Sequence, residues 1–438
     1  MSLSRSESER KGLAQRQQLS RPDLGRLARR KFDPIQVLRD SSRNRIPKLL
    51  PVKFKLMSSS PFVFYRGSVE IMAGDLAAGE HTGIYAQLCG DAHVKNFGFY
   101  ATPGSDIVLD VNDFDETWRG PWEWDVKRMA ASIVLAGREA GDTDSRCKDA
   151  VSDFTGQYCA WIRRFASMPT LDVARHRITR DFRDPFIRTA LEKAERSTPL
   201  TNVKKLAHKT AHGLRFRVQP NALWEVDGKT RNLVLNALKD YAGTLSPDHQ
   251  FLSNRYRAVD VGFKVVGTGS VGTFDYVVLL LGYDEDDPLF LQVKEEPPSA
   301  YAPYIKDPTA PRHQGERAVR GQHMLQVLSD MLLGWCSIDG RDYLVRHLND
   351  HKSSIDPEEL SGKRLLVYGR VCAELLAKGH ARSGDPVMLA AYLGRSDKAA
   401  RALQQFAIKY ADQVEADYTT FRKAFKRGQL TPKDTKEV

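Results

Sequence analysis

Two short segments hold the densest group of side chains that could do chemistry, CGDAHVKNFG at 89–98 and IVLDVNDFDE at 107–116. Asp91 and Asn96 stand five positions apart in the first segment, and Asp113 ends the apolar run of the second. Phosphoryl transfer needs a carboxylate that orients the attacking hydroxyl, and oxygen ligands for a metal ion that bridges the nucleotide phosphates. We therefore expect Asp91, Asn96 and Asp113 to form a catalytic set.

A glycine-rich segment, GTGSVGT, follows much later in the chain. A dinucleotide site would need a helix directly after these glycines, so that its N-terminus faces the pyrophosphate. An apolar β-type run, TFDYVVLLL, follows instead, so we expect a hairpin, and a glycine-rich hairpin over phosphates is typical of kinases. The next apolar run ends in a lysine, where kinases carry a phosphate-binding lysine. The predicted nucleotide-binding residues are Gly267, Gly269, Ser270, Gly272 and Lys294.

The first two segments resemble known phosphotransferases. The letters GDAHVKN, followed by an apolar strand and an Asp-Phe pair, are similar to the H-G-D-x-H-x-x-N…I-D-F pattern of the aminoglycoside and choline kinase group. This resemblance implies that Asp125, at the start of the helix in GPWEWDVKRMAAS, braces the catalytic loop through backbone N–H groups. It also implies an acidic partner for Lys294 in the next helix, for which Glu316 is the candidate, whereas the role expected for His93 is structural, as a hydrogen-bond partner of the loop.

More ordinary roles stay open for several of these residues. Asp125 could simply favour the positive end of a helix dipole. Glu295 or Gln322 could take the place of Glu316. Cys89 has no evident base beside it that would make it a nucleophile.

The order of the motifs predicts the fold. In ordinary kinases the glycine-rich hairpin and its lysine precede the catalytic loop, whereas here the hairpin follows it. We therefore expect an α+β protein with a kinase-like two-lobe fold in circularly permuted order, built from a small antiparallel-sheet lobe and a larger helical lobe. Permutation is physically tolerable where the chain ends lie close together and the core is kept.

A broader resemblance covers nearly the whole chain after about residue 30. The chain resembles the bacterial family DUF2252, a domain family of unknown function, in the combination of FYRG, CGDAHVKNFG, NDFDET, GPWEWDVKR, VGTGSVGT, LFLQVKEE and HARSGD. The family name implies no activity, so the expectation of a phosphotransferase rests on the residues above. Asp-Phe-Asp in place of Asp-Phe-Gly, and Cys89 where kinases of this group often have His, are departures that bear on regulation and substrate.

Hydrophobic periodicity predicts the elements that must position these residues. Helical spacing is expected at 55–80, 121–166, 314–330, 365–380 and 396–428, and strands at 84–90, 105–114, 341–348 and, as three consecutive antiparallel strands, within 255–295. We divide the chain into a basic N-terminal arm, a large-lobe segment with the catalytic loop and a helical insertion, a small lobe, and a helical large-lobe segment, at 1–48, 49–250, 251–350 and 351–438.

The positive charge is concentrated at the N-terminus. The chain has a formal net charge of +11, and residues 1–48 hold thirteen Lys or Arg against five Asp or Glu. We expect an arm that is solvated or docks on an acidic surface, and nucleic acid is a possible partner only through it.

Composition favours a cytoplasmic protein. No apolar signal region starts the chain, no apolar run approaches the length of a membrane span, and the five cysteines are scattered as expected in a reducing compartment.

The motifs together predict an ATP-dependent, Mg²⁺-requiring phosphotransferase that acts on a small-molecule or protein hydroxyl. Asp115 joins Asn96 and Asp113 as a predicted Mg²⁺ ligand. Catalysis would consist of positioning and charge neutralisation, without a covalent enzyme intermediate. Nucleotidyl transfer, or nucleotide binding without catalysis, is compatible with the same motifs.

Two alternatives belong to other classes. In a metal-dependent hydrolase, Asp91, His93, Asp110 and Asp113 would bind Mn²⁺ or Zn²⁺, which leaves the hairpin and Lys294 without a function. In a nucleic-acid-binding protein, the basic arm would be the contact surface and binding would fall steeply with salt.

Overall fold

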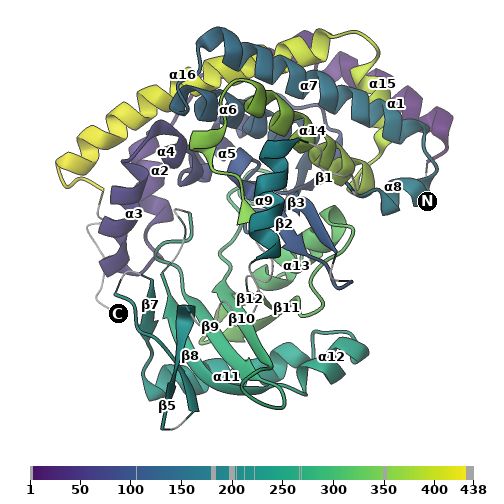
Figure 1. Ribbon diagram of the computed structural model, residues 1–438. Helices are drawn as coiled ribbons and strands as arrows, with labels where there is room; N and C mark the ends of the chain where they lie inside the picture. The colour runs from purple at the N-terminus through teal and green to yellow at the C-terminus, as the bar shows by residue number, and fades with distance from the viewer. Residues whose placement is uncertain are drawn as a thin grey trace.

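The computed structural model shows a mixed α+β structure with antiparallel sheets, which confirms that part of the fold prediction. The structure describes residues 3–104, 106–178, 184–196, 203, 205–211, 213–220, 222–265, 267, 269–348 and 353–430. A helical part holds α1, α6, α7, α14, α15 and α16, and a second part is built on the sheet that contains β8, β9 and β10 (Figure 1).

The described α-helices are α1 Arg5–Gln18, α2 Pro34–Ser41, α3 Leu50–Met57, α4 Pro61–Arg66, α5 Val69–Ala77, α6 Trp122–Glu139, α7 Asp144–Ser167, α8 Thr170–Arg175, α9 Pro185–Glu195, α11 Gly228–Ala242, α12 Pro247–Ser253, α13 Gln314–Leu325, α14 Lys363–Ser383, α15 Pro386–Leu393 and α16 Lys398–Lys426. Short 3₁₀ turns are η1 Arg21–Gly25, η2 Pro47–Leu49, η3 Val94–Asn96 and η4 Pro357–Glu359.

The described strands are β1 Tyr85–Leu88, β2 Phe97–Ala101, β3 Ile107–Val111, β4 Trp118–Pro121, β5 Ala207–Thr210, β6 Gly213–Phe216, β7 Leu223–Glu225, β8 Arg257–Lys264, β9 Asp275–Leu281, β10 Pro288–Glu295, β11 Gly334–Ile338, β12 Arg341–His347 and β13 Ser353–Ser354.

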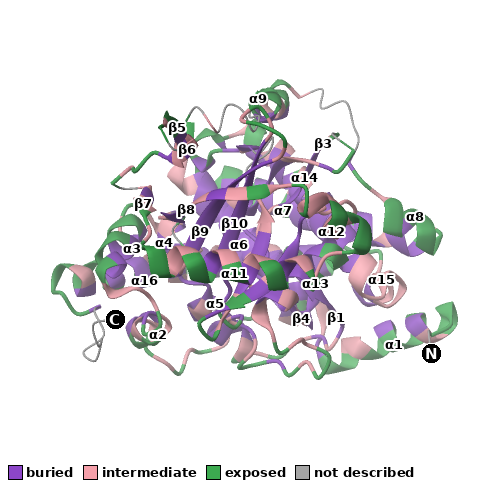
Figure 2. Ribbon diagram, turned by 90° about the horizontal axis from the view of Figure 1, so that it is seen from below, coloured by how far each residue is buried: buried purple, intermediate pink, exposed green. Residues whose placement is uncertain are grey.

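The largest sheet has six strands in the order β11-β12-β10-β9-β8-β7, and every neighbouring pair is antiparallel. The three consecutive strands expected within 255–295 are β8, β9 and β10, so that prediction is confirmed. Strands β9 and β10 are buried at every position because both faces of the sheet are covered (Figure 2). On one face Val234 and Tyr241 of α11 join a cluster with Val278 and Leu291.

The helical part is centred on α6, which is buried along most of its length and packs on α7, α14 and α16. The helix expected over 121–166 is two helices, because Gly141 has a positive φ of 83° and the Thr143 side chain caps the start of α7. The helix expected over 55–80 is three helices, since the Ser60 side chain caps α4 directly before Pro61 and α4 ends at Gly67. The final helix is confirmed, and Gly428 follows its end with φ 65°.

Two small sheets hold the segments with the expected chemistry. Strand β1 pairs with β4, and β2 lies between β13 and β3 in a three-stranded sheet. The loop after β1 carries Asp91, and the segment after β3 carries Asp113. Antiparallel pairing of β2 and β3 therefore brings these two segments to the same end of one sheet.

The N-terminal segment is docked on the helical part, so of the two arrangements expected for it, solvated or docked on an acidic surface, the solvated one is not found. Helix α1 lies beside α15, and η1 packs on α16 (Figure 1). The Arg16 side chain donates to the Tyr392 and Ala391 carbonyls at the end of α15, where a cation is favoured. The many basic residues of the N-terminal segment suggested exposure to solvent. Several of them instead donate to carbonyls at helix ends or pair with buried acids.

The sheet-containing part begins earlier than the expected boundary at residue 251. Strand β7 pairs with β8, and α11 packs on β11, so 223–242 belong with the six-stranded sheet rather than with a helical insertion of the other part. Strand β7 is short and the outer face of α11 is polar, so the periodicity of hydrophobic residues is too weak there to predict these elements from the sequence.

Among the described residues, no helix combines the length and apolar character that a membrane span requires.

Arg30 provides a test of the docked N-terminal segment. Its side chain pairs with Asp75 at 2.5 Å and with Asp417 at 2.8 Å, and both carboxylates are buried. Removing one partner of a buried ion pair leaves an uncompensated charge that costs about 3 kcal/mol. We expect Arg30→Met to lower the melting temperature by several degrees. Arg26→Met, at an exposed pair with Asp23, is the control and should change it by less than one degree; equal effects would contradict the docked arrangement.

Candidate functional site

A cavity of about 90 Å³ brings together residues from six separate stretches of the chain. Its walls come from the N-terminal segment, the end of α4 with the start of α5, the loop after β1, the segment after β3, the hairpin before β9, and the end of β10. Of the residues predicted from the sequence, it is lined by Asp91, His93, Asn96, Asp113, Asp115, Gly267, Gly269, Ser270 and Lys294. Gly272, Asp125 and Glu316 do not line it.

The loop after β1 is anchored by Asp125 at the start of α6. The buried Asp125 carboxylate accepts hydrogen bonds from the backbone N–H groups of Cys89, at 2.8 Å, and Gly90, at 3.0 Å, which is the bracing contact expected for it. Gly90 has φ 85°, and a Cβ there would collide with the Glu116 carbonyl. The loop therefore has one fixed path between β1 and the segment that follows β3.

Asp91 is held by an arginine that lies outside the cavity. The fully buried Arg128 of α6 donates through Nε to Asp91 Oδ1 at 2.7 Å. Burial acts to raise the pKa of Asp91, but Arg128 and His93 outweigh it and hold the pKa well below its usual range. Asp91 is thus a permanently ionised acceptor suited to orienting a hydroxyl, and a weak general base.

Asn96 and His93 complete the loop. The Asn96 amide nitrogen donates to the Asp91 carbonyl at 2.8 Å, so its Oδ1 is the atom left for a ligand. The Lys95 backbone N–H donates to His93 Nδ1, and His93 Nε2 lies 3.4 Å from Asp91 Oδ2. His93 therefore has the structural position expected for it, between the loop backbone and Asp91.

Lys294 joins the sheet-containing part to the segment after β3. Its ammonium group contacts the Asp115 carboxylate closely and lies 3.8 Å from Asp113 Oδ1. Burial acts to lower the pKa of Lys294, but Asp113 and Asp115 raise it above its usual value. The pKa of Asp115 is also raised, to about 6, because burial and the Asp113 charge outweigh the attraction of Lys294. The single positive charge of Lys294 therefore cannot neutralise both carboxylates.

Two further acids, Glu116 and Glu296, add to this excess of negative charge around Lys294. Burial and Glu70 raise the pKa of Glu116, in the cavity wall, to about 7. Glu296, two residues after Lys294 in the chain, is buried, and neither of its carboxylate oxygens has a hydrogen-bond partner among the described residues. Burial raises its pKa well above the usual value.

The oxygen donors in this cavity are of the kind that Mg²⁺ prefers in proteins. Asn96 and Asp113 offer an amide oxygen and a carboxylate in one cavity, and Asp115 Oδ1 is buried without a hydrogen-bond partner in the described part of the chain. Hard oxygen ligands with excess negative charge favour a divalent cation. Within the described ranges, no group of three or more His, Cys, Asp or Glu side chains is placed so that it could hold a metal ion by itself.

The glycine-rich hairpin is clasped from the N-terminal segment. Gly267 and Gly272 have φ values of 67° and 93°, which glycine adopts without strain. Arg45 donates to the carbonyls of Gly269, at 2.7 Å, and Val271, at 2.8 Å, and the Ile46 N–H donates to Gly272. The hairpin tip is therefore positioned by residues more than two hundred positions earlier in the chain.

The pairing of Glu316 with Lys294 is wrong. Glu316 pairs instead with Arg320, one turn along α13, at 2.5 Å. The inward side of α13 carries the buried Arg317, which donates to the carbonyls of Asp115 and Thr117. Helix α13 therefore supports the segment after β3 with a cation rather than supplying an acid to the lysine.

The structure also separates Asp110 from the other members of the proposed hydrolase set. Asp110 forms a buried ion pair with Lys378 of α14, and it does not line the cavity with Asp91, His93 and Asp113. The four residues are not brought together around one metal position.

Sequence reasoning missed several residues of the site, among them Arg45, Arg66, Arg128 and Glu296. Arg66 is the arginine of FYRG, and Arg128 that of GPWEWDVKR, so their motifs were visible but their roles were not. Arg45 and Glu296 carry no local signal, since their importance arises only from tertiary contacts.

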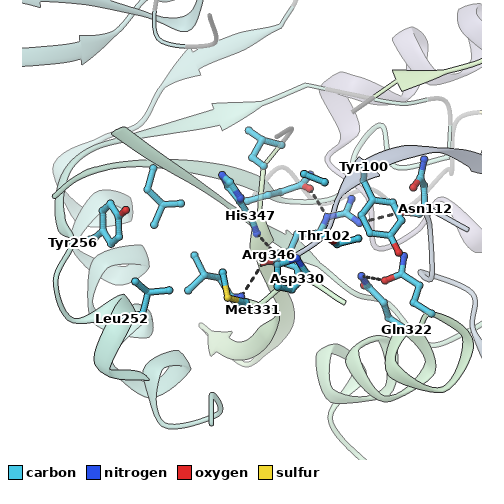
Figure 3. A pocket seen from close by; sticks show the side chains of 17 residues that line it. Tyr100, Thr102, Asn112, Leu252, Tyr256, Gln322, Asp330, Met331, Arg346 and His347 are labelled. Atoms are coloured by element: carbon cyan, nitrogen blue, oxygen red, sulfur yellow. Dashed lines mark hydrogen bonds between the residues drawn. The ribbon is translucent and has the colours of Figure 1, made fainter. Parts of the chain in front are cut away.

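A second cavity, of about 310 Å³, is lined in part by Asn112, the residue before Asp113. Figure 3 shows Asn112 and Arg346 on one side of it, and Leu252 and Tyr256 on the other. Arg346 donates to Gln292 Oε1 at 2.9 Å and to the Asn112 carbonyl at 3.3 Å. These polar contacts link β12 to β10 and to the residue before Asp113.

The comparisons with known proteins identify a family but no relative of established function. A family model described as "Uncharacterized protein conserved in bacteria (DUF2252)" matches residues 45–424. A search of curated proteins and a search of solved structures each found no match.

The surplus of carboxylates predicts a stabilising substitution. Because the folded-state pKa of Asp115 is about 6, above its ordinary value of 3.8, ionisation of this group disfavours folding above pH 6. Asp115→Asn should raise the melting temperature of the ligand-free protein by about 2 °C at pH 8. The advantage should shrink below pH 6 and vanish only once the pH falls below the unfolded-state pKa of 3.8, where the carboxyl is protonated in both states.

Scanning calorimetry of Asp115→Asn beside Asp106→Asn, at an exposed acid, is the measurement. A lower melting temperature for Asp115→Asn at pH 8 would contradict an excess of negative charge in the cavity.

Proposed function

The chain belongs to the bacterial DUF2252 family, and from its cavity we propose an ATP-dependent, Mg²⁺-requiring phosphotransferase of kinase-like, circularly permuted fold. The observation that carries this proposal is the meeting of Lys294 with Asp113 and Asp115, in the same cavity as Asp91 and Asn96. A phosphate-binding cation, metal-binding oxygens and a hydroxyl-orienting carboxylate are the parts that phosphoryl transfer needs.

The topology around Lys294 supports the kinase-like fold. The glycine-rich hairpin connects β8 and β9, Lys294 lies on the next strand β10, and helix α13 follows. This is the order of glycine-rich loop, lysine strand and helix in protein kinases. The catalytic-loop segment precedes all of them in the chain, as a permuted order requires.

Asp91 would accept a hydrogen bond from the acceptor hydroxyl and aim its oxygen at the terminal phosphorus of ATP. A bond forms between that oxygen and phosphorus while the bond from phosphorus to the bridging oxygen breaks, and ADP leaves with the electron pair. The hydroxyl proton passes to Asp91 late in the step, when the acceptor oxygen has become strongly acidic, and then to solvent. The low pKa of Asp91 suits such a late transfer.

Asn96, Asp113 and Asp115 would hold Mg²⁺, which supplies charge neutralisation for the phosphates when bound. Lys294 and the hairpin around Gly269 would grip the same phosphates. The cavity, at about 90 Å³, is smaller than the roughly 300–1,000 Å³ of usual ligand pockets, so it matches the phosphate end of a nucleotide. Admission of the whole nucleotide then requires the hairpin to move away from the segment after β3.

The arrangement favours this function over the alternatives. The pairing of Asp110 with Lys378 speaks against the four-residue hydrolase site. The docking of the N-terminal segment leaves less of its basic charge for nucleic acid than a solvated arm would.

Variants of the cavity test the proposal. We expect Lys294→Met and Asp113→Asn each to lower ATP turnover at least about 100-fold, because each removes a charge that meets the phosphates or their metal. Turnover is measured as ADP formed in the presence of a metabolite extract that supplies acceptors. Lys306→Met, at an exposed lysine, is the control. Unchanged turnover in both cavity variants would refute the proposed function.

Asp91→Asn separates positioning from nucleotide binding. The amide keeps the size of the side chain but weakens its hold on the acceptor hydroxyl and on Arg128. We expect turnover to fall about 100-fold or more while the affinity for Mg²⁺ and ATP stays within about threefold. If the loss of affinity accounted for the whole loss of turnover, Asp91 would not have the role assigned to it.

A further inference from the structure

Arg66 is distinct among the cations that line the cavity because, among the described residues, its guanidinium has neither a carboxylate nor a carbonyl as a hydrogen-bond partner. It lines the cavity near Asp91 and His93, yet no carboxylate of the described residues lies within 4.0 Å of it. By contrast, Lys294 contacts Asp115, and Arg45 is satisfied by two hairpin carbonyls.

The nearest polar atom to Arg66 cannot accept a hydrogen bond from it. Arg66 Nε lies 3.4 Å from His93 Nε2. Because the Lys95 N–H donates to His93 Nδ1, that nitrogen holds the lone pair and Nε2 must carry the proton. The Nε2–H group faces Asp91 Oδ2, so the contact with Arg66 joins two donors. The Arg66 guanidinium is therefore left with donors for an acceptor that enters the cavity.

The hairpin places Arg66 beside the expected path of the phosphates. A Cβ on Gly269 would lie 3.8 Å from the Arg66 carbonyl, so the hairpin tip rests against the Arg66 backbone. Asp91 and Asp113 line the same cavity as Arg66 and, with Glu139 and Asp356, attract its charge, so the guanidinium shares this space with the acceptor-orienting carboxylate and the metal-binding one. The terminal phosphoryl group must pass through this space on its way from ADP to the acceptor.

Keeping Arg66 charged here has an energetic cost, which an anion would offset. Burial lowers the pKa of Arg66, an effect that its neighbouring acids only partly oppose. A half-buried guanidinium without a hydrogen-bonded anion is unfavourable, and its planar donors match two oxygens of a phosphate at once.

We propose that Arg66 binds the terminal phosphoryl group of ATP and stabilises the charge on its oxygens during transfer, while Arg45 positions the hairpin over the other phosphates. This inference rests on the proposed function and assigns a catalytic residue to it that lies in neither the catalytic loop nor the sheet. Arg66 forms no covalent bond and transfers no proton; the bonds that form and break are those between phosphorus and the acceptor and bridging oxygens.

The test is the affinity of the protein for Mg²⁺ with ATP and for Mg²⁺ with ADP, measured by calorimetric titration. Because only ATP carries the terminal phosphoryl group, Arg66→Gln should weaken ATP binding about tenfold and leave ADP binding unchanged. Arg66→Lys, which keeps the charge but loses the paired donors, should fall between. Arg45→Gln should weaken both nucleotides by similar factors.

Arg119→Gln is the matched control, since Arg119 is also half-buried and donates to a backbone carbonyl, but lies outside the cavity. An unchanged ratio of ATP to ADP affinity in a normally melting Arg66→Gln protein would overturn the inference, and is the result expected if Arg66 bound an anionic acceptor instead. Failure of the unsubstituted protein to bind either nucleotide would refute the proposed function itself.

Discussion

The site depends on one electrostatic contact, that of Lys294 on β10 with Asp113 and Asp115 in the segment after β3. It joins the part built on the six-stranded sheet to the part that holds the catalytic-type loop. The contact is not a neutral pair, because Glu116 and Glu296 add carboxylates that no nearby cation fully compensates. Such a surplus destabilises the empty cavity and favours the entry of a divalent cation, so the cost of the arrangement is consistent with a binding role.

The arginines around this centre have different roles, which depend on the hydrogen-bond partners that each already has. Arg128 is fully engaged with Asp91 and Tyr65, so it fixes the carboxylate that would orient the acceptor. Arg45 is engaged with backbone carbonyls and therefore fixes the hairpin. The Arg66 guanidinium contacts neither a carboxylate nor a backbone carbonyl among the described residues, so it remains available to bind the ligand. The N-terminal segment and α4, which precede every recognised kinase-type motif, thus supply two of the three cations in the cavity.

Sequence reading located the centre of the site because its residues lie in short motifs with fixed spacing. Asp91, Asn96, Asp113 and Lys294 converge although they come from distant segments, and the strands β8 to β10 were visible from their apolar runs. It failed on contacts between distant elements. Glu316 was chosen for its residue type, but the rotation of α13 directs Arg317 inward instead. The sequence did not decide between a solvated and a docked N-terminal segment, because the partners of its basic residues are helix-end carbonyls and single buried acids.

The most direct measurement of the central claim uses Mn²⁺ in place of Mg²⁺ with ATP bound. Electron–nuclear double resonance should detect coupling between the metal and the phosphorus atoms of ATP in the unsubstituted protein. The coupling should be lost or strongly reduced in Asp113→Asn. Metal–phosphorus coupling that is identical in the two proteins would contradict the account, since the metal and phosphates would then bind away from Asp113 and Lys294.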